Sequence, residues 1–464
     1  MTIRNKAAIA GIGQTEFSKD SGRSTLHMAL EAILQALDDA GLQPKDIDGV
    51  VKMGANDDIF EIDLARSLGL ANLRFFAEIP HGGGASCGTV AAATAAVVSG
   101  MADVVVTFRS LNERSERRFG LSNLGGGLGG WMQYKMPHGL VTPAQWVSIF
   151  AQRYLFEYGH TTEEFGRVSV LARKHAATNP HAMMYGRPIT LEEHQASRWI
   201  AEPLRLLDCT LDTDGACAAI VVSAEKAKRL EEEGRRKMKH AEEERGIRRA
   251  EVGGTTQRDR SGIEREDRGQ SPQPVLSEGG AAAEGGGSGG VPPTYSSRRR
   301  GEGGSDPERR AVYIAAAAQG TGSQTEMMTS YQRPSLSRLE EAEATARQLY
   351  RIAELTPKDI DVAEIYDHFT PFVLMALEAY GFAEPGKAPW LFREGRLELD
   401  GEMPLNTHGG HLGEGYLHGF GHIVEAVRQL RGAAANQAHD PKTVLVTSGT
   451  GVPTSGLILS KGGY

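Results

Sequence analysis

A seven-residue segment that occurs twice constrains the fold of this chain more than any other feature. Residues 42–48 read LQPKDID and residues 355–361 read LTPKDID, so six of the seven positions match. Proline fixes its own φ and suits the first turn of a short helix, and aspartate is favoured near the same end. Each copy therefore predicts a connector from a helix to a strand, and we expect two similar halves.

The elements expected around the two copies follow the same order. In each half the pattern predicts a strand, a helix, the connector, a second strand, a glycine-rich segment, a helix and a third strand. The ranges are 7–12, 25–40, 42–48, 49–53, 82–88, 89–99 and 103–108 in the first half, and 311–316, 339–354, 355–361, 362–366, 409–415, 419–431 and 443–446 in the second. Strands that alternate with helices favour a sheet covered by helices on both faces, so the duplication predicts two such sheets that share a central layer.

One long segment differs in composition from both halves. Residues 230–308 carry clusters of charge and a run of glycine, alanine and serine, with few large apolar side chains. Such a segment buries too little apolar surface to offset its ordering entropy, so we expect a disordered or loosely helical insert. Opposite charges at helical spacing favour, in its first part, an extension of a helix that starts near residue 223. The predicted division is 1–229 with a loop region at 110–210, the insert at 230–308, and 309–464.

Charge and cysteine content narrow the class of protein. The 464 residues have a net charge of -8 with both signs mixed, which gives no electrostatic reason to expect nucleic acid or an anionic membrane as partner. Three cysteines cannot form a disulfide framework, and they lack zinc-type spacing. The N-terminus has no signal pattern, and no apolar run approaches the roughly 20 residues that cross a bilayer. These features predict a cytoplasmic protein without a membrane span.

Four short motifs carry a resemblance to a known superfamily. Residues 85–88 read ASCG, 366–369 read YDHF, 415–417 read GYL and 447–449 read TSG. Together with the closing GTGVPTSGLILSK, they resemble the thiolase superfamily over the whole chain apart from the insert. The resemblance implies an α/β duplicated thiolase fold, layered α-β-α-β-α with two mixed sheets. The usual reactive side chains are absent, because Ala85 takes the position of the nucleophilic cysteine, and Tyr366 and Tyr416 take the positions of the acid–base and oxyanion-hole side chains.

Longer stretches resemble one branch of that superfamily. PHGGGAS at 80–86, YDHFTPF at 366–372 and GEGYLHG at 413–419 are similar to the steroid side-chain acyl-CoA aldolases of the lipid-transfer-protein-like branch. This resemblance implies that Tyr366 and Tyr416 form a catalytic pair. The implied reaction is retro-aldol cleavage of a β-hydroxyacyl-CoA, such as a steroid 17-hydroxy-20-carboxyl-CoA, to a ketone and propionyl-CoA. A homodimer, an accessory subunit with an OB-fold and a zinc ribbon, and no cofactor beyond the CoA thioester substrate are implied as well.

Retro-aldol cleavage sets the chemistry that these residues must supply. It needs a base for the hydroxyl proton, stabilisation of the thioester enolate and an acid that quenches the enolate. Two phenols can be base and acid, each step contributing about 10²- to 10⁴-fold. Because a phenol with a pKa near 10 is a poor base, we expect one tyrosine pKa to be lowered, with His368 and His418 as the nearest candidates. Asp367 and His368 are expected to orient loops. The backbone N–H groups of Ala85 and Gly449 are expected to form the oxyanion hole.

Other interpretations stay open from the sequence. One is a thiolase or acyltransferase that uses Cys87 as a displaced nucleophile, and another is a non-catalytic thiolase-like scaffold subunit. Histidines 81, 408, 411 and 422 lie near the glycine-rich turns but lack paired spacing on one helix face, so no metal site is expected. Residues 109–118, RSLNERSERR, are expected as a solvated charged loop or as a contact with CoA near the subunit boundary.

Overall fold

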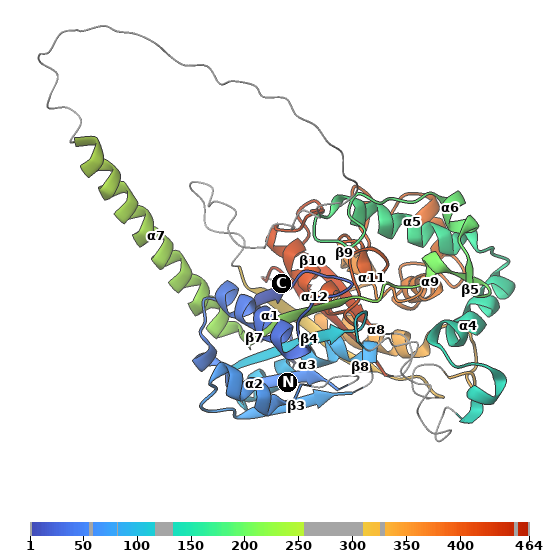
Figure 1. The fold of residues 1–464 in the computed structure, drawn as a ribbon, viewed down its shortest axis with the longest axis horizontal. Helices are drawn as coiled ribbons and strands as arrows, with labels where there is room; N and C mark the ends of the chain where they lie inside the picture. Colours follow the sequence, from blue (N-terminus) through green and yellow to red (C-terminus); the bar gives the residue numbers. More distant parts are fainter. Residues whose placement is uncertain are drawn as a thin grey trace, which may run out of the picture. The chain divides into compact units, whose positions relative to one another are not determined.

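The computed structural model describes residues 2–54, 59–80, 82–116, 133–254, 310–324, 330–449 and 453–462. These residues form a mixed α/β fold (Figure 1). The first half contains β1 (Ala7–Gln14), α1 (Thr25–Ala40), β2 (Gly49–Met53), α2 (Glu61–Leu68), β3 (Phe75–Ile79), α3 (Ser86–Ser99), β4 (Val104–Asn112) and β7 (Asp214–Ser223). The second half contains β8 (Val312–Gly320), α8 (Glu340–Ala353), β9 (Val362–Glu364), α9 (Thr370–Ala379), α10 (Ala388–Arg393), α11 (Gly410–Gly413), α12 (Phe420–Arg431), β10 (Thr443–Ser448) and β11 (Thr454–Ser460).

The repeated heptapeptides adopt the same local structure. Each forms a 3-10 turn that begins at its proline, at Pro44–Asp46 and at Pro357–Asp359. In each turn the aspartate side chain accepts a hydrogen bond from the backbone N–H just before the proline, at 2.8 Å and 2.7 Å respectively. The connectors predicted from the sequence are therefore confirmed.

The sheet shows the duplication in its strand order, which is β3-β2-β4-β7-β1-β8-β11-β10-β9. In each half the last strand lies antiparallel beside the first, with β7 on β1 and β11 on β8. In each half the second and third of the expected strands are parallel, β2 with β4 and β9 with β10. Two separate sheets were expected, but β1 and β8 pair through Ala8–Tyr313 and Ile9–Val312. This short antiparallel contact joins the halves into one nine-stranded mixed sheet.

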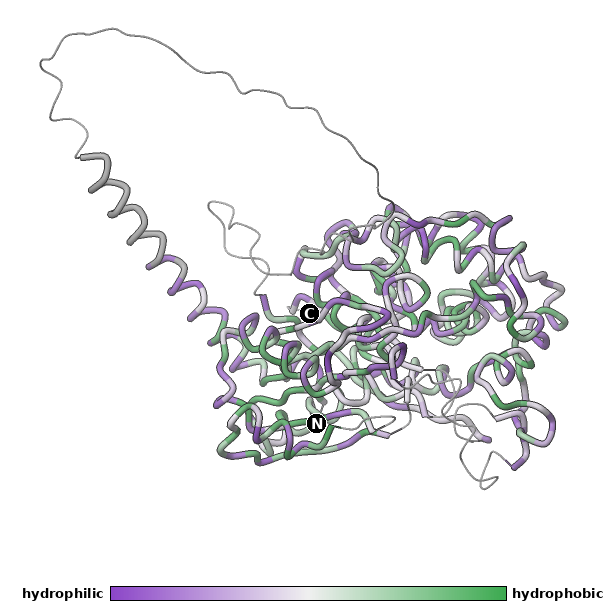
Figure 2. Tube along the Cα trace, viewed as in Figure 1, coloured by the Kyte–Doolittle hydropathy of each residue, from purple (hydrophilic) through white to green (hydrophobic). Residues whose placement is uncertain are grey.

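Helices cover the strands in the layered order that the duplication predicts. Helix α1 packs on β1, β4 and β7, and α8 packs on β8 and β11. Helices α3 and α12 contact strands of both halves and therefore form the central layer. Small side chains such as Cys87, Ala93 and Ala96 are fully buried on α3, so this helix fits between the strands of the two halves. Figure 2 shows hydrophobic residues concentrated along the strands.

The expected loop region at 110–210 contains helices that pack on the second half. They are α4 (Pro143–Tyr158), α5 (Glu163–Thr178) and α6 (Leu191–Ala196), and they are followed by the two-stranded sheet β5 (Trp199–Ala201) and β6 (Leu204–Arg205). Helices α4 and α5 contact α9, and α5 also contacts α10 and α11. The rings of Phe150 and Phe372 lie 5.5 Å apart, and the Tyr154 hydroxyl donates to Glu378 at 2.6 Å.

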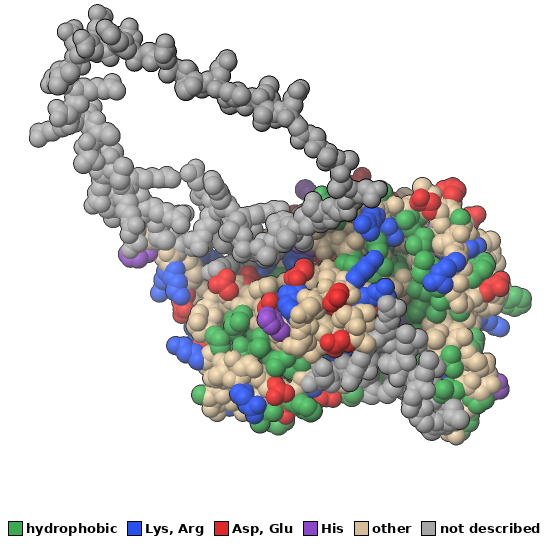
Figure 3. Space-filling view, viewed as in Figure 1, with side chains coloured by type: hydrophobic (Ala, Val, Ile, Leu, Met, Phe, Trp, Pro, Cys, Tyr) green, Lys and Arg blue, Asp and Glu red, His purple; other side chains and the backbone are tan. Residues whose placement is uncertain are grey.

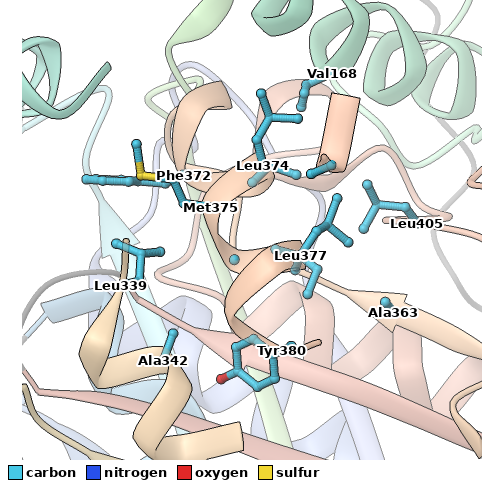
Figure 4. Packing of buried hydrophobic residues seen from close by; sticks show 14 of the residues in the cluster. Val168, Leu339, Ala342, Ala363, Phe372, Leu374, Met375, Leu377, Tyr380 and Leu405 are labelled. Atoms are coloured by element: carbon cyan, nitrogen blue, oxygen red, sulfur yellow. The ribbon is translucent and has the colours of Figure 1, made fainter. Parts of the chain in front are cut away.

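Helix α9 is held in place by this packing. Figure 4 shows its side chains Phe372, Leu374 and Met375 between Val168 of α5 and Leu339, which directly precedes α8. Because α9 begins at Thr370, its position fixes the turn that carries residues 366–369. The core of the second half thus supports the candidate site directly.

The two halves belong to one compact unit, made of Met1–Gly234 and Asp306–Tyr464. Helix α7 runs from Ala224 to Gly254, which agrees with the helical extension expected from the charge pattern. Residues 255–308 of the expected insert lie outside the described residues, so the disorder predicted there stays a prediction.

Helix hydropathy and surface charge agree with what the composition predicts. No helix among the described residues is both long and apolar enough to cross a membrane. The face drawn in Figure 3 carries acidic and basic side chains side by side.

Close packing of α1 on β1 predicts a large stability effect at Gly13. A Cβ atom there would lie 2.0 Å from the carbonyl oxygen of Ala32, on the backbone of α1. We expect Gly13→Ala to destabilise the protein by about 1–3 kcal/mol, because the helix must shift to make room. Thermal unfolding measures this, with Gly234→Ala as the control, since no atom lies within 4 Å of a Cβ at that position. Equal melting temperatures for the two variants would contradict the packing.

Candidate active site

Two tyrosines of the second half meet in a buried site. Tyr366 lies two residues after β9, and Tyr416 lies in the turn between α11 and α12. Their hydroxyl oxygens are 2.9 Å apart, and their rings meet edge to face with centroids 6.4 Å apart. Only 3% and 7% of their surfaces are exposed. The structure therefore brings together the two phenols that the motifs single out.

Two threonines fix the backbone of the tyrosine pair. The N–H of Tyr366 donates to the hydroxyl of Thr447 on β10 at 2.9 Å. The N–H of Tyr416 donates to the hydroxyl of Thr213 at 2.8 Å, and that hydroxyl donates in turn to the Tyr416 carbonyl at 3.0 Å. Thr213 directly precedes β7 of the first half, so both halves position the pair.

Glycine-rich backbone closes over the Tyr366 hydroxyl. A Cβ on Gly83 would lie 1.9 Å from that oxygen, so only glycine allows the loop to approach so closely. Gly449 has a φ of +68°, and a Cβ there would lie 2.5 Å from the backbone of Gly84. The backbone before Ala85 and the backbone at Gly449 are thus in contact beside the tyrosine hydroxyl. These are the two segments from which the oxyanion hole is predicted.

Burial raises the pKa of both phenols. The pKa of Tyr366 is raised above its ordinary value mainly because the hydroxyl is removed from water, and the hydrogen bond from Tyr416 lowers it in part. The pKa of Tyr416 is also raised well above its ordinary value, by burial and by the neighbouring Tyr366. Glu113 raises the pKa of both phenols and Arg109 lowers it. The expectation of a lowered tyrosine pKa is therefore wrong, because a sequence motif does not reveal how completely its residues are desolvated.

The two neighbouring histidines carry no positive charge. Burial and the nearby His411 lower the pKa of His368 to about 3. Burial and Arg109 hold the pKa of His418 well below its usual range. The Nε–H of Arg109 donates to Nδ1 of His418 at 3.3 Å, so the cation at this site is Arg109. His368 and His418, the nearest candidates for lowering a tyrosine pKa, therefore do not do so through a positive charge.

Asp367 organises the turn around the pair. Its carboxylate accepts hydrogen bonds from the backbone N–H groups of His411 at 2.8 Å and Leu412 at 3.2 Å. Ring nitrogens of His411 and His422 lie 3.1 Å and 3.2 Å from the same carboxylate. Burial opposes its charge, but these two histidines hold the pKa of Asp367 well below its usual range. Asp367 thus ties α11, which leads to Tyr416, to the turn that carries Tyr366.

A second buried group of charged residues lies behind this turn. Glu364 is hydrogen-bonded by the Thr407 hydroxyl at 3.0 Å and lies 3.1 Å from Nδ1 of His408. Burial raises the pKa of Glu364 to about 7. The Thr407 hydroxyl also lies 2.7 Å from Glu425, so the threonine links the two carboxyl groups.

Two sets of three side chains among the described residues bring metal-ligand atoms within 4.8 Å of one another. They are Asp367, His411 and His422, and Glu364, His408 and Glu425. In the first set, Nε2 of His422 lies 2.9 Å from the Ile365 carbonyl, to which only a protonated nitrogen can donate. That nitrogen then has no lone pair for a metal. His81 lies outside the described residues, and the absence of a metal site stays a prediction.

Cys87 does not have the properties of a nucleophile. It is fully buried, and its thiol points to the Val446 carbonyl at 3.7 Å. Burial raises the pKa of the Cys87 thiol to about 12, and the pKa values of Cys209 and Cys217 are raised as well. A thiolate is therefore disfavoured at neutral pH at each of the three cysteines.

Sequence reasoning missed two charged residues near the tyrosines. A solvated loop is wrong for Arg109 and Glu113, which are 1% and 2% exposed. The reason is that β4 continues to Asn112, beyond the expected end at residue 108, and carries Arg109 into the interior. The apolar run that precedes residue 109 was the available signal. A contact of this segment with CoA stays a prediction, and residues 117–118 lie outside the described residues.

Comparison with known proteins gives consistent matches. The family model described as "Thiolase C-terminal domain-like" matches residues 322–460. A steroid side-chain-cleaving aldolase of Thermomonospora curvata is 45% identical over 458 residues, covering 98% of this chain and 97% of that protein. The 17-hydroxy-3-oxo-4-pregnene-20-carboxyl-CoA lyase of Mycobacterium tuberculosis is 43% identical over 462 residues, covering 98% and 100%.

A solved structure agrees with these relatives. The Ltp2-ChsH2(DUF35) aldolase superposes with a TM-score of 0.78 at 44% identity, covering 99% of this chain and 98% of that one. The resemblance and the fold class predicted from the motifs are thereby confirmed.

The buried histidines predict a protein that loses stability in acid. The pKa values of His175, His368, His408, His411 and His418 are lowered by burial. At these five histidines the unfolded chain binds more protons than the folded one below pH 6.5, so the stability that they contribute is present above that pH and is lost as the pH falls. Each such histidine contributes about 1.4 kcal/mol per pH unit below its unfolded pKa. Glu364 acts in the opposite sense, because its raised pKa removes stability as the pH rises through about 7.

Melting temperatures measured from pH 4 to pH 8 test this expectation. We expect a steep fall on the acid side of pH 6.5. His175→Gln should reduce the number of protons taken up on unfolding by about one and so make the fall less steep. The residue can be replaced because, among the described residues, its ring bonds only the backbone carbonyls of Leu405 and Asn406. A melting temperature that does not change between pH 6.5 and pH 4.5 would contradict it.

Proposed function

Because the chain belongs to the thiolase superfamily, in its branch of steroid side-chain-cleaving aldolases, we propose that Tyr366 and Tyr416 are its catalytic pair. The protein is a carbon–carbon lyase, an acyl-CoA aldolase that cleaves a β-hydroxyacyl-CoA by the retro-aldol reaction. The observation that carries the proposal is the 2.9 Å contact between the two buried hydroxyls.

The proposed proton transfers balance within the pair. The substrate hydroxyl gives its proton to one phenol oxygen while the bond between its carbon and the α-carbon of the thioester breaks. The carbonyl of the ketone forms, and the bonding electrons pass to the thioester enolate. The first phenol passes its own proton to the second, and the second protonates the enolate carbon. One proton leaves the substrate and one returns, so no net exchange with solvent is needed.

The raised pKa values of both phenols fit coupled transfers of this kind. At neutral pH neither phenol is ionised to a useful extent, so a free phenolate does not accumulate. A proton can still pass along two hydroxyls that are already hydrogen-bonded, because each accepts as it donates.

The glycine-rich backbone is proposed to hold the thioester oxygen. Backbone N–H groups of Ala85 and Gly449 would stabilise the enolate oxygen as charge develops on it. The close approach of Gly449 to Gly84, beside the Tyr366 hydroxyl, supports this assignment. Asp367, His368 and His418 are proposed as supporting residues that orient the pair.

A steroid side-chain thioester is the proposed substrate. Relatives that are 45% and 43% identical over nearly the full chain act on steroid side chains, the second on a 17-hydroxy-20-carboxyl-CoA. Cleavage of such a thioester between the hydroxyl-bearing ring carbon and the α-carbon yields a 17-ketone and propionyl-CoA. Each proposed step uses only protein groups and the thioester, so the mechanism requires no further cofactor.

An accessory subunit and a second copy are the proposed partners. The similar solved aldolase contains a DUF35 partner, and we expect a subunit of this kind with an OB-fold and a zinc ribbon. Edge strand β3 supports a homodimer, because among the described strands it pairs with β2 alone and Phe76 is 61% exposed. Phe60 and Ile62, at the start of α2, are also exposed large apolar residues.

Two further expectations stay proposals. The chain is divided at about residues 230 and 308 into two thiolase halves and an insert. The location is the cytoplasm, whose reducing conditions suit the three free cysteines.

Removal of either hydroxyl tests the catalytic pair. We expect Tyr366→Phe and Tyr416→Phe each to lower kcat by at least about 10²-fold, with a small change in KM, because the proton path is broken. The assay incubates the protein, with a co-expressed DUF35 subunit, with a tertiary β-hydroxyacyl-CoA and measures ketone and propionyl-CoA. Tyr380→Phe is the matched control, because the Tyr380 hydroxyl has no hydrogen bond among the described residues. Wild-type turnover in both active-site variants would refute the pair.

The loop over Tyr366 provides a second test. Gly83→Ala places a methyl group where the Tyr366 hydroxyl lies, so the phenol must move. We expect a loss of about 10²-fold in kcat, the cost of a displacement of about 1 Å at a reacting group. Gly234→Ala, where no atom is close, should cleave the substrate at the wild-type rate. Full activity of Gly83→Ala would place the reaction elsewhere.

A further inference from the structure

A short segment of the first half lies against both turns that carry the tyrosine pair. It consists of residues 208–213, between β6 and β7, and we call it the bridging segment. Near its start, Cys209 pairs with Phe369 in an isolated antiparallel bridge. At its end, Thr213 exchanges two hydrogen bonds with the backbone of Tyr416. One stretch of the first half thus reaches the turn of each tyrosine.

Thr210, in the middle of the bridging segment, donates a hydrogen bond to each side. Its backbone N–H donates to the His368 carbonyl at 3.1 Å, in the turn that carries Tyr366. Its hydroxyl donates to the His411 carbonyl at 3.0 Å, in α11, which leads to Tyr416. A single residue therefore ties the turn of one tyrosine to the helix that precedes the other.

The bridging segment is itself anchored at both ends. Asp208 is fully buried, and its carboxylate accepts hydrogen bonds from the Thr370 hydroxyl at 2.6 Å and from the Arg205 backbone N–H at 2.7 Å. Nε2 of His194 lies 2.8 Å from the same carboxylate. At the other end, Thr213 directly precedes β7, which pairs with two strands of the sheet. A segment fixed in this way can hold its hydrogen-bond partners at constant positions.

Asp367 also joins the two turns, but it holds His411 from the opposite side. The Asp367 carboxylate binds the N–H of His411, whereas the Thr210 hydroxyl binds its carbonyl. A residue held only at its N–H can still rotate about that bond, whereas one held at its N–H and its C=O cannot. The His411 ring lies 4.7 Å from the ring of Tyr366 and 4.9 Å from that of Tyr416. Any movement of His411 is therefore passed on to both phenols.

We propose that Thr210 is a positioning residue of the retro-aldol reaction, which fixes α11 relative to the turn of Tyr366 and thereby keeps the two phenol hydroxyls in contact. The inference rests on the proposed function of the pair, and it assigns a residue of the first half to that function. The proposed proton transfer needs this contact, because a displacement of about 1 Å at a reacting group costs about 10²-fold in rate. Thr210 acts through the backbone of the two turns and takes no part in the transfers themselves.

Removal of the side-chain bond alone tests this role. Thr210→Val keeps the shape and the backbone N–H and loses the hydroxyl, whereas Thr210→Ser keeps the hydroxyl. In the cleavage assay with the co-expressed DUF35 subunit, we expect Thr210→Val to lower kcat by about tenfold with KM within about twofold, and Thr210→Ser to keep most of the activity. Thr345→Val is the matched control, because the Thr345 hydroxyl also donates to a backbone carbonyl, that of Glu341 in α8. It should turn over at the wild-type rate.

A second background shows whether Thr210 acts through the tyrosine pair. In Tyr416→Phe the transfer between the hydroxyls is already lost, so Thr210→Val added to it should lower the remaining rate no further. A general loss of structure would instead multiply the two effects.

A fluorinated tyrosine in place of Tyr416 gives a readout that does not depend on turnover. In fluorine NMR spectra of the full chain with its DUF35 partner, we expect Thr210→Val to shift or broaden the resonance and Thr345→Val to leave it unchanged. An unchanged resonance or a wild-type kcat in Thr210→Val, an equal loss of kcat in Thr210→Ser, or a further loss in the double variant would overturn the positioning role. Failure of the proposed function would appear instead as wild-type turnover in Tyr366→Phe and Tyr416→Phe.

Discussion

The hydrogen bond between the hydroxyls of Tyr366 and Tyr416 is the contact on which the proposed chemistry of this protein depends. The two oxygens come from separate turns, and each turn is fixed by a threonine from a distant segment, Thr447 on β10 for one and Thr213, just before β7, for the other. The separation of 2.9 Å is therefore a property of the whole α/β framework. Both halves of the duplicated chain must be in place before the two phenols can share a proton.

The surroundings of the pair favour proton movement without proton loss. His368, His411 and His418 are neutral, and a neutral imidazole both accepts and donates a hydrogen bond. Beneath them Asp367 is ionised. Burial lowers the pKa of His422, but its hydrogen bond to that carboxylate and the carboxylate's charge outweigh burial and raise it. The charge is thus paired one layer away from the phenols. Desolvated phenols beside neutral rings exchange protons with each other more readily than with solvent.

The sequence predicts the fold well and the site in part. The repeated heptapeptide places both connectors, and helix α1 and strand β2 have the predicted ends. Strands β7 and β11 escape prediction because they are buried on both faces and show no alternation. The tyrosines can be located from motifs, because a motif records residue identity. The direction of their pKa shifts and the burial of Arg109 cannot be predicted from motifs, since both depend on how much water the tertiary packing removes.

Helices α4 and α5 precede the insert in the chain, yet they bury their apolar faces on α9, α10 and α11 of the second half. During synthesis the ribosome releases Phe150 and Tyr154 some 220 residues before their partners Phe372 and Glu378. Over that interval the nascent first half exposes a surface that it cannot cover with its own residues. Such a delay leaves apolar surface exposed on incomplete chains, which is the condition that favours their aggregation.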